Sequence, residues 1–170
     1  MLEAAGRKET PQMDVVQWLL SHDVDANAQN VSLCLPLHFA ALNGCPEMCR
    51  ILLEHDANIN AQDKYGEVPL HKVARPNIRH HQLDIMQLLL DQGTDVNIRD
   101  NDGSTLLHHS SWWQKGESVI VMGTIEGSRL LLKHGATIDA ENDEGKTPLQ
   151  VALEGGNYEM AEFLSGLGAK

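Results

Sequence analysis

The amino-acid sequence repeats itself, and this repetition restricts the fold more than any other feature of the chain. A leucine pair recurs in the same sequence context as Leu19-Leu20, Leu52-Leu53, Leu89-Leu90 and Leu131-Leu132. Because these pairs open at residues 19, 52, 89 and 131, successive pairs are 33, 37 and 42 residues apart. A period of this length is typical of a stack of small units, each of which buries its apolar face against its neighbours.

Each unit reads as a turn followed by two short helices. Pro36 suits the first position of a helix, because its missing N–H would be unpaired there in any case. Gly44 suits the end of that helix, because glycine adopts the left-handed conformation without strain. Met48, Ile51 and Leu52 then recur at the spacing of a second helix. Helices this short are not stable alone in water, so they must pack against neighbouring units.

The second helix of each unit must end at a residue that tolerates the left-handed conformation. Gly93, Gly135 and Gly168 fill this position in three units, whereas Asp23 and Asp56 fill it in the first two. Aspartate tolerates this conformation less well than glycine does. The sequence therefore predicts a less favourable helix end in the first two units.

The start of each unit resembles the T-P-L-H-x-A signature of the ankyrin repeat, whose period is about 33 residues. The matching segments are Pro36–Ala40, Pro69–Ala74, Leu106–Ser110 and Thr147–Ala152, and the hairpin glycine of the family is matched by Gly66, Gly103 and Gly145. The resemblance covers about residues 11–170 and implies an all-α repeat solenoid, elongated and curved, with β-hairpin fingers on helix-turn-helix units. Its structural signature residues here are Pro36, His38, Pro69, His71, His108 and Pro148.

The repeat markers divide the chain into five ankyrin-type units. The predicted bounds are 1–29 for a truncated first unit, 30–62, 63–99 and 100–141 for the next three, and 142–170 for the C-terminal unit. The third unit carries an insertion near 75–81 and the fourth carries one near 111–122, both between the first and second helix. Glu159 and Glu162 suit the polar outer face of a terminal unit, although a piece of a longer array fits the sequence equally well.

The resemblance implies a protein–protein interaction module that binds a protein or peptide through its concave finger face, with no catalytic residues. The implied contact positions flank the hairpin glycines and the exposed side of the first helices. They hold Val31, Ser32, Lys64, Tyr65, Glu67, Asn101, Asp102, Ser104, Asp143, Glu144 and Lys146. Tyr65 is the only aromatic residue among them, and aromatic residues are enriched at binding hot spots, so it is the best single anchor.

The two insertions predict a second binding surface, because they break the period in neighbouring units at the same structural corner. Its candidate residues are Arg75, Arg79, His80, His81, Trp112 and Trp113. Arginine and tryptophan are enriched at hot spots. The alternative is that the two tryptophans fold back over the apolar residues of their own insertion, and a mixed case buries one and exposes the other.

Charge separates the remaining interpretations. The chain has 24 acidic and 13 basic residues, a formal net charge of −11, which disfavours binding to phosphate backbones. The acidic segment Asp139–Glu144 around the last hairpin favours a basic partner, unless it is only a solvated loop. The main alternative is an RNA or single-stranded nucleic-acid binder that uses Lys72, Arg75 and Arg79 with Trp112 and Trp113 as a stacking platform. A second alternative is a structural spacer within a larger protein.

Several function classes lack their motifs. The sequence holds no phosphate-binding loop, no G-x-S-x-G and no H-E-x-x-H, so we expect neither catalysis nor a cofactor. The histidines and the cysteines spell out no closed set of metal ligands, so no metal site is expected. The odd number of cysteines suits an intracellular, cytoplasmic or nuclear setting, and no apolar run is long enough for membrane insertion. We expect a monomer.

Overall fold

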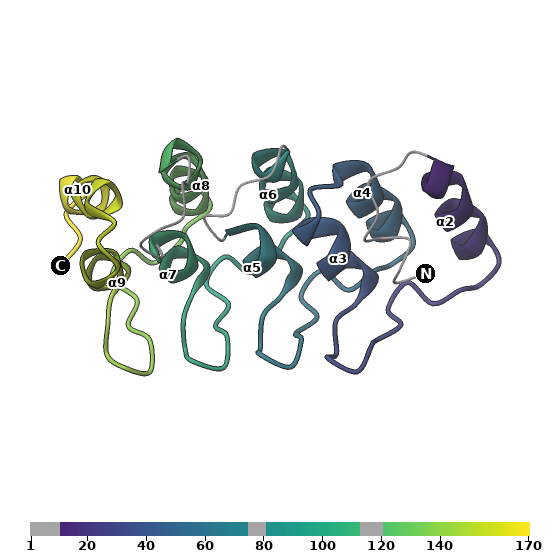
Figure 1. Ribbon diagram of the computed structural model, residues 1–170, viewed down its shortest axis with the longest axis horizontal. Helices are drawn as coiled ribbons and strands as arrows, with labels where there is room; N and C mark the ends of the chain where they lie inside the picture. The colour runs from purple at the N-terminus through teal and green to yellow at the C-terminus, as the bar shows by residue number, and fades with distance from the viewer. Residues whose placement is uncertain (1–10, 75–80, 113–120) are drawn as a thin grey trace. The chain divides into compact units, whose positions relative to one another are not determined.

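The computed structural model describes residues 11–74, 81–112 and 121–170, and in this part of the chain it forms nine helices. They are α2 (Pro11–Ser21), α3 (Pro36–Leu42), α4 (Pro46–Glu54), α5 (Pro69–Ala74), α6 (Gln82–Asp91), α7 (Leu106–Ser111), α8 (Val121–Lys133), α9 (Pro148–Gly155) and α10 (Tyr158–Gly166) (Figure 1). Pairs of short helices alternate with hairpin loops in the predicted order. The all-α repeat class is confirmed.

The chain divides into two compact bodies, which we describe separately. The N-terminal body comprises residues up to Val73 together with Arg79–Thr94, and the C-terminal body comprises Ala74–Ile78 and Asp95–Lys170. Within each body, the first helices of the units form one layer and the second helices form another, and the hairpin loops leave on the side of the first helices (Figure 1). The hairpins are made of turns, and the one β-bridge among the described residues joins Arg99 and Thr105.

Each body has an aliphatic core between its two layers. The largest fully buried side chains of the N-terminal body include Leu35, Leu37, Leu52, Leu70, Ile85 and Leu89, and those of the C-terminal body include Leu106, Leu107, Leu131, Met160 and Leu164. The leucine pairs supply one fully buried member in each of three units. This explains why the pair is the most regular marker of the repeat.

Asparagine side chains tie successive units together within each body. The side-chain nitrogen of Asn27 donates to the Asp56 carbonyl at 2.9 Å, and its side-chain oxygen accepts the Asn58 N–H at 2.6 Å. Asn97 does the same with the Gly135 carbonyl and the Thr137 N–H, at 3.1 and 2.8 Å. The polar segments after the first and third leucine pairs therefore connect neighbouring repeats.

The predicted insertions, near 75–81 and 111–122, lie mostly outside the described residues, between α5 and α6 and between α7 and α8. The first follows α5, which ends at Ala74, and the second follows α7, which ends at Ser111. Helix α8 begins at Val121, so the end of the second insertion, predicted near 111–122, belongs to a helix. Residues 1–10 of the truncated first unit lie outside the described residues.

Candidate protein-binding surface

Four hairpin loops, which we call the first to fourth fingers, share one local geometry. They are Asn30–Cys34, Asp63–Glu67, Asp100–Ser104 and Asn142–Lys146. In each finger, Oδ1 of the first residue accepts the N–H groups of the residues two and four positions later. In the second finger these bonds run from Tyr65 at 2.8 Å and from Glu67 at 3.1 Å to Asp63. Asparagine and aspartate form such turns readily, so the first residue of each finger defines its shape.

Neighbouring fingers are joined at their tips. In the N-terminal body, the Lys64 N–H donates to the Ser32 carbonyl at 3.0 Å, which links the first and second fingers. In the C-terminal body, the Asp143 N–H donates to the Asp102 carbonyl at 3.1 Å, which links the third and fourth. Each body therefore presents a pair of tips as one fixed surface.

Most of the predicted contact residues are accessible. Val31 is fully exposed, Tyr65 is 58% exposed, and Lys64, Asn101, Asp102, Asp143 and Glu144 are exposed, while Ser32, Ser104 and Lys146 are half-buried. We call these ten residues the fingertip surface. Its N-terminal part carries an aromatic and an aliphatic side chain, and its C-terminal part is mainly acidic.

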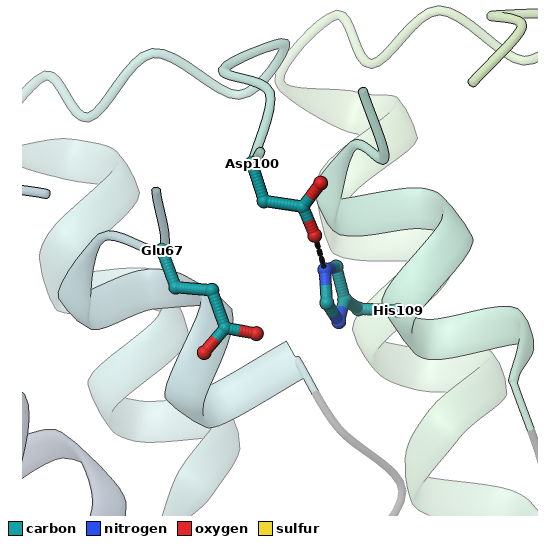
Figure 2. A group of neighbouring side chains, drawn as sticks. All are labelled: Glu67, Asp100 and His109. Carbon is teal, nitrogen blue, oxygen red and sulfur yellow. Dashed lines mark hydrogen bonds and ion pairs between the residues drawn. The ribbon is translucent and has the colours of Figure 1, made fainter. Parts of the chain in front are cut away.

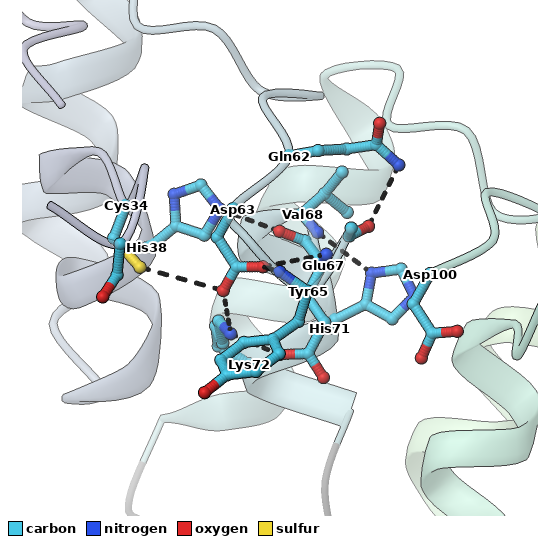
Figure 3. Close-up of polar contacts among 12 residues, drawn as sticks. Cys34, His38, Gln62, Asp63, Tyr65, Glu67, Val68, His71, Lys72 and Asp100 are labelled. Carbon is cyan, nitrogen blue, oxygen red and sulfur yellow. Dashed lines mark hydrogen bonds and ion pairs between the residues drawn. The ribbon is translucent and has the colours of Figure 1, made fainter. Parts of the chain in front are cut away.

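Glu67 does not belong to this surface, and its prediction as an exposed contact residue is wrong. Glu67 is only 2% exposed. Its carboxylate binds the Lys72 ammonium group on α5, and its backbone carbonyl accepts a hydrogen bond from His38 (Figure 3). The side chain turns towards the helix layer because a buried cation compensates its charge there.

Lys72 joins two carboxylates in a buried ion triad. Its Nζ lies 2.6 Å from Asp63 Oδ2 and also contacts Glu67 (Figure 3). Burial opposes the charged forms, but the ion pairs prevail, so the pKa of Asp63 is lowered and the pKa of Lys72 is raised. The nucleic-acid interpretation, which uses Lys72 as an exposed cation, is wrong for this residue because its charge is already neutralised.

A related pair occurs in the C-terminal body. His109 Nε2 on α7 lies 2.7 Å from Asp100 Oδ2 (Figure 2). Burial raises the pKa of Asp100, but the contact with His109 and the hydrogen bonds from the Ser104 and Asp102 N–H groups together outweigh burial and leave that pKa below its usual range. His109 occupies the position in its helix that Lys72 occupies in α5. The two fingers that begin with aspartate thus have a basic residue at the matching position of the following helix.

The histidines of the signature are buried hydrogen-bonding groups. His38 Nδ1 accepts the Leu35 N–H at 3.1 Å, and its Nε2 lies 3.0 Å from the Glu67 carbonyl. His108 repeats this arrangement with the Thr105 N–H at 3.1 Å and the Lys146 carbonyl at 2.9 Å. Because one nitrogen accepts and the other donates, each ring is neutral, and burial lowers both pKa values.

We expect the free energy of unfolding to fall as the pH drops below about 6.5, the ordinary pKa of histidine. Because burial lowers the pKa of His38 and of His108 in the folded chain, the unfolded chain binds more protons below that pH. Urea titrations between about pH 7.5 and 5.5 measure this dependence. The double variant His38→Gln/His108→Gln should show a shallower slope, and an unchanged slope would contradict the assignment.

Only part of the predicted second surface can be placed. Arg75, Arg79, His80 and Trp113 lie outside the described residues. Trp112 is 56% exposed. His81 is exposed, and its Nδ1 lies 3.1 Å from Asp84 Oδ2. The second surface stays a prediction, with Trp112 as its exposed aromatic residue.

The carboxylates of the C-terminal fingertips are partly paired. Lys146 Nζ lies 2.7 Å from Glu144 Oε2 and 2.6 Å from Glu154 Oε2. Arg99 donates to the Glu141 carbonyl at 2.7 Å and lies 3.4 Å from Asp143. Asp102, Asp139, Glu141, Asp143 and Glu144 exceed these two cations in number and are all exposed. This pair of fingertips is therefore negative.

The structure also shows a residue that sequence reasoning missed. Leu33 occupies the place of the hairpin glycine in the first finger, with φ +58°, where Gly66, Gly103 and Gly145 have φ between +70° and +76°. For a residue with a Cβ this conformation costs about 1–2 kcal/mol. The missing glycine is visible when the four fingers are aligned by their first residue, and that alignment is the signal that could have found it.

Comparisons with known proteins also identify ankyrin repeats along the chain. A family model described as ankyrin repeats in three copies matches residues 2–100 and also residues 70–170. Human SH3 and multiple ankyrin repeat domains protein 2 is 28% identical over 127 residues, 75% of this chain and 6% of that protein. Mouse B-cell lymphoma 3 protein homolog is 32% identical over 134 residues, 76% and 27% of the two chains. The NF-kappa-B inhibitor cactus of Drosophila yakuba is 38% identical over 71 residues, which are 41% of this chain and 13% of that protein.

The chain spans less than a third of the length of each of these relatives. The part of the chain that the structure describes contains no helix with the length and apolar content needed to cross a membrane.

Proposed function

The chain belongs to the ankyrin repeat family, and from this premise we propose that it binds a protein or peptide partner through the fingertip surface. The observation that carries the proposal is the pairing of exposed fingertips, fixed by the Lys64–Ser32 and Asp143–Asp102 backbone bonds. A rigid surface loses little entropy on binding, which favours affinity. One relative is called an inhibitor of NF-kappa-B. For this chain we propose binding without catalysis, and we assign it no particular partner.

We propose that the partner is basic where it meets the C-terminal body. The exposed carboxylates of the third and fourth fingers exceed their cations, and the chain carries a formal net charge of −11. Such a surface attracts a basic segment over a distance and excludes acidic ones. The three cysteines are free thiols, which supports an intracellular setting, in the cytoplasm or the nucleus. We further propose the five repeat bounds derived above and a monomeric chain.

Selection from a displayed library of random peptides tests this function. We expect the enriched peptides to be rich in lysine and arginine and to lose affinity as salt is added. Asp102→Asn combined with Glu144→Gln should weaken the best peptide by about five- to tenfold, because two exposed charges are removed. Glu162→Gln on α10 is the matched control and should have no effect. If no peptide is enriched, the structural-spacer alternative is favoured instead.

A further inference from the structure

We infer that the first finger is an apolar anchor, in which Val31 and Leu33 receive an aliphatic or aromatic side chain of the partner. The inference rests on the proposed function and specifies the chemistry of the partner at the N-terminal body. A partner would thus supply at least one apolar side chain in addition to the basic residues that the C-terminal fingertips attract.

The backbone of the first finger is the starting point. The Leu33 N–H donates to the Asn30 carbonyl at 2.9 Å, and the Gly66 N–H donates to the Asp63 carbonyl at the same distance. The turn is therefore the same with leucine as with glycine. Glycine makes this turn without strain, because the left-handed conformation is open to it, whereas leucine rarely adopts that conformation. The hairpin alone gives no reason for leucine at this position.

Burial does not provide the reason either. Val31 is fully exposed and gains nothing from burial, and Leu33 keeps 45% of its surface exposed, so burial offsets the strain of its backbone only in part. The matching positions of the third finger are the polar Asn101 and the small Gly103. A strained apolar residue that remains exposed points to a contact outside the chain, because strain of this kind concentrates at binding sites.

The neighbouring finger extends the apolar patch. The bond from the Lys64 N–H to the Ser32 carbonyl holds Tyr65 next to the first finger, since Ser32 lies between Val31 and Leu33. The Tyr65 ring is 58% exposed, and Lys64 Nζ lies 4.8 Å from the ring centroid. The finger that is bonded to the first finger therefore adds an exposed aromatic ring to its two aliphatic side chains, and exposed apolar residues of this kind mark binding sites.

The test uses the best basic peptide from the library selection and two variants of the first finger. Leu33→Asn keeps a residue that tolerates the left-handed conformation but removes the apolar side chain. Leu33→Gly removes the strain as well. We expect each variant to lower the affinity for the peptide by about tenfold. Leu33→Gly should at the same time raise Tm. If Leu33 had a purely structural role, a higher Tm would not be accompanied by weaker binding.

Asp56→Gly is the matched control for strain relief. Asp56 has φ +60° at the end of α4, outside the fingers. We expect this variant to raise Tm without changing affinity, because it removes strain and no fingertip side chain. A second peptide carries serine in place of the apolar residues of the first. It should bind the wild-type chain more weakly than the first peptide does, and it should bind the Leu33→Asn variant and the wild-type chain with equal affinity.

The outcomes separate this inference from the proposed function. Equal affinity of the wild-type chain and both Leu33 variants for the original peptide would overturn the apolar anchor, and so would enriched peptides that are basic but contain no preferred apolar residue. Both results leave the acidic fingertips as a binding surface if Asp102→Asn/Glu144→Gln still weakens binding. Loss of the basic preference, with no effect of that double variant, would overturn the proposed function itself.

Discussion

Lys72→Met is expected to lower the free energy of unfolding by about 3 kcal/mol, because the substitution leaves two buried carboxylates without a cation. The side chains of Asp63 and Glu67 are only 1% and 3% exposed, and Lys72 binds both. Methionine has nearly the same volume as lysine, so a cavity contributes little. Urea unfolding followed by far-UV circular dichroism measures the change.

Lys146→Met is the matched control for this prediction. Lys146 also contacts two carboxylates, those of Glu144 and Glu154, but these are exposed and water solvates them when the cation is removed. We expect little change in stability for this variant. Adding Glu67→Gln to Lys72→Met should restore part of the lost stability, because one buried charge disappears. Equal losses for Lys72→Met and Lys146→Met would show that the triad is not a buried charge cluster.

The repeat class was predictable because spacing alone carries the signal for the helices. The proline that opens a first helix, the leucine pair of a second helix and the glycine after it recur in a fixed order, and each has a local physical cause. The sequence pattern of a single repeat fails to predict contacts between two side chains that lie on different elements. Glu67 is in a finger, where its resemblance to contact positions suggests exposure, yet its partner Lys72 lies on the following helix and turns it inward.

The pairing rule of the fingers is present in the sequence but invisible in any one repeat. Fingers that begin with Asp63 and Asp100 are followed by helices with Lys72 and His109 at the matching position. Fingers that begin with Asn30 and Asn142 are instead followed by the apolar residues Phe39 and Val151. A carboxylate accepts the same two backbone N–H groups as an amide but needs a counter-charge when it is buried. Aligning the repeats against one another, rather than against a family signature, would have shown this.

The fingertip residues were predictable only as positions. The resemblance indicates where fingers lie, and most of the predicted residues are exposed there, but chemistry differs from finger to finger. Leu33 was missed because the resemblance rests on the glycines that match the family. The first finger has no glycine at that position and so does not contribute to the resemblance. A departure from the repeat carries more information about binding than agreement with it, since agreement is already required by the fold.

His108→Ala is expected to lower the free energy of unfolding by about 3 kcal/mol. His108 Nδ1 satisfies the Thr105 N–H at the start of α7, and its Nε2 reaches the Lys146 carbonyl of the next repeat at 2.9 Å. Alanine removes both hydrogen bonds and leaves a cavity at a position only 2% exposed. The loss therefore combines a helix cap, a bond between repeats and buried volume, and urea unfolding measures their sum.

His108→Gln separates these contributions, because the last repeat already has glutamine at this position. Gln150 Oε1 accepts the Thr147 N–H at 2.9 Å, so an amide can supply the cap that Nδ1 of histidine supplies. We expect His108→Gln to lose about half as much stability as His108→Ala, since the cap and most of the volume survive. Gln150→Ala, at an exposed position, should cost only about 1 kcal/mol, the value of a cap alone. If His108→Gln lowers the free energy of unfolding as much as His108→Ala does, the bond to Lys146 dominates. If Gln150→Ala also lowers it by the same amount, the bond between repeats contributes nothing. The assignment of His108 as a link between repeats would then be wrong.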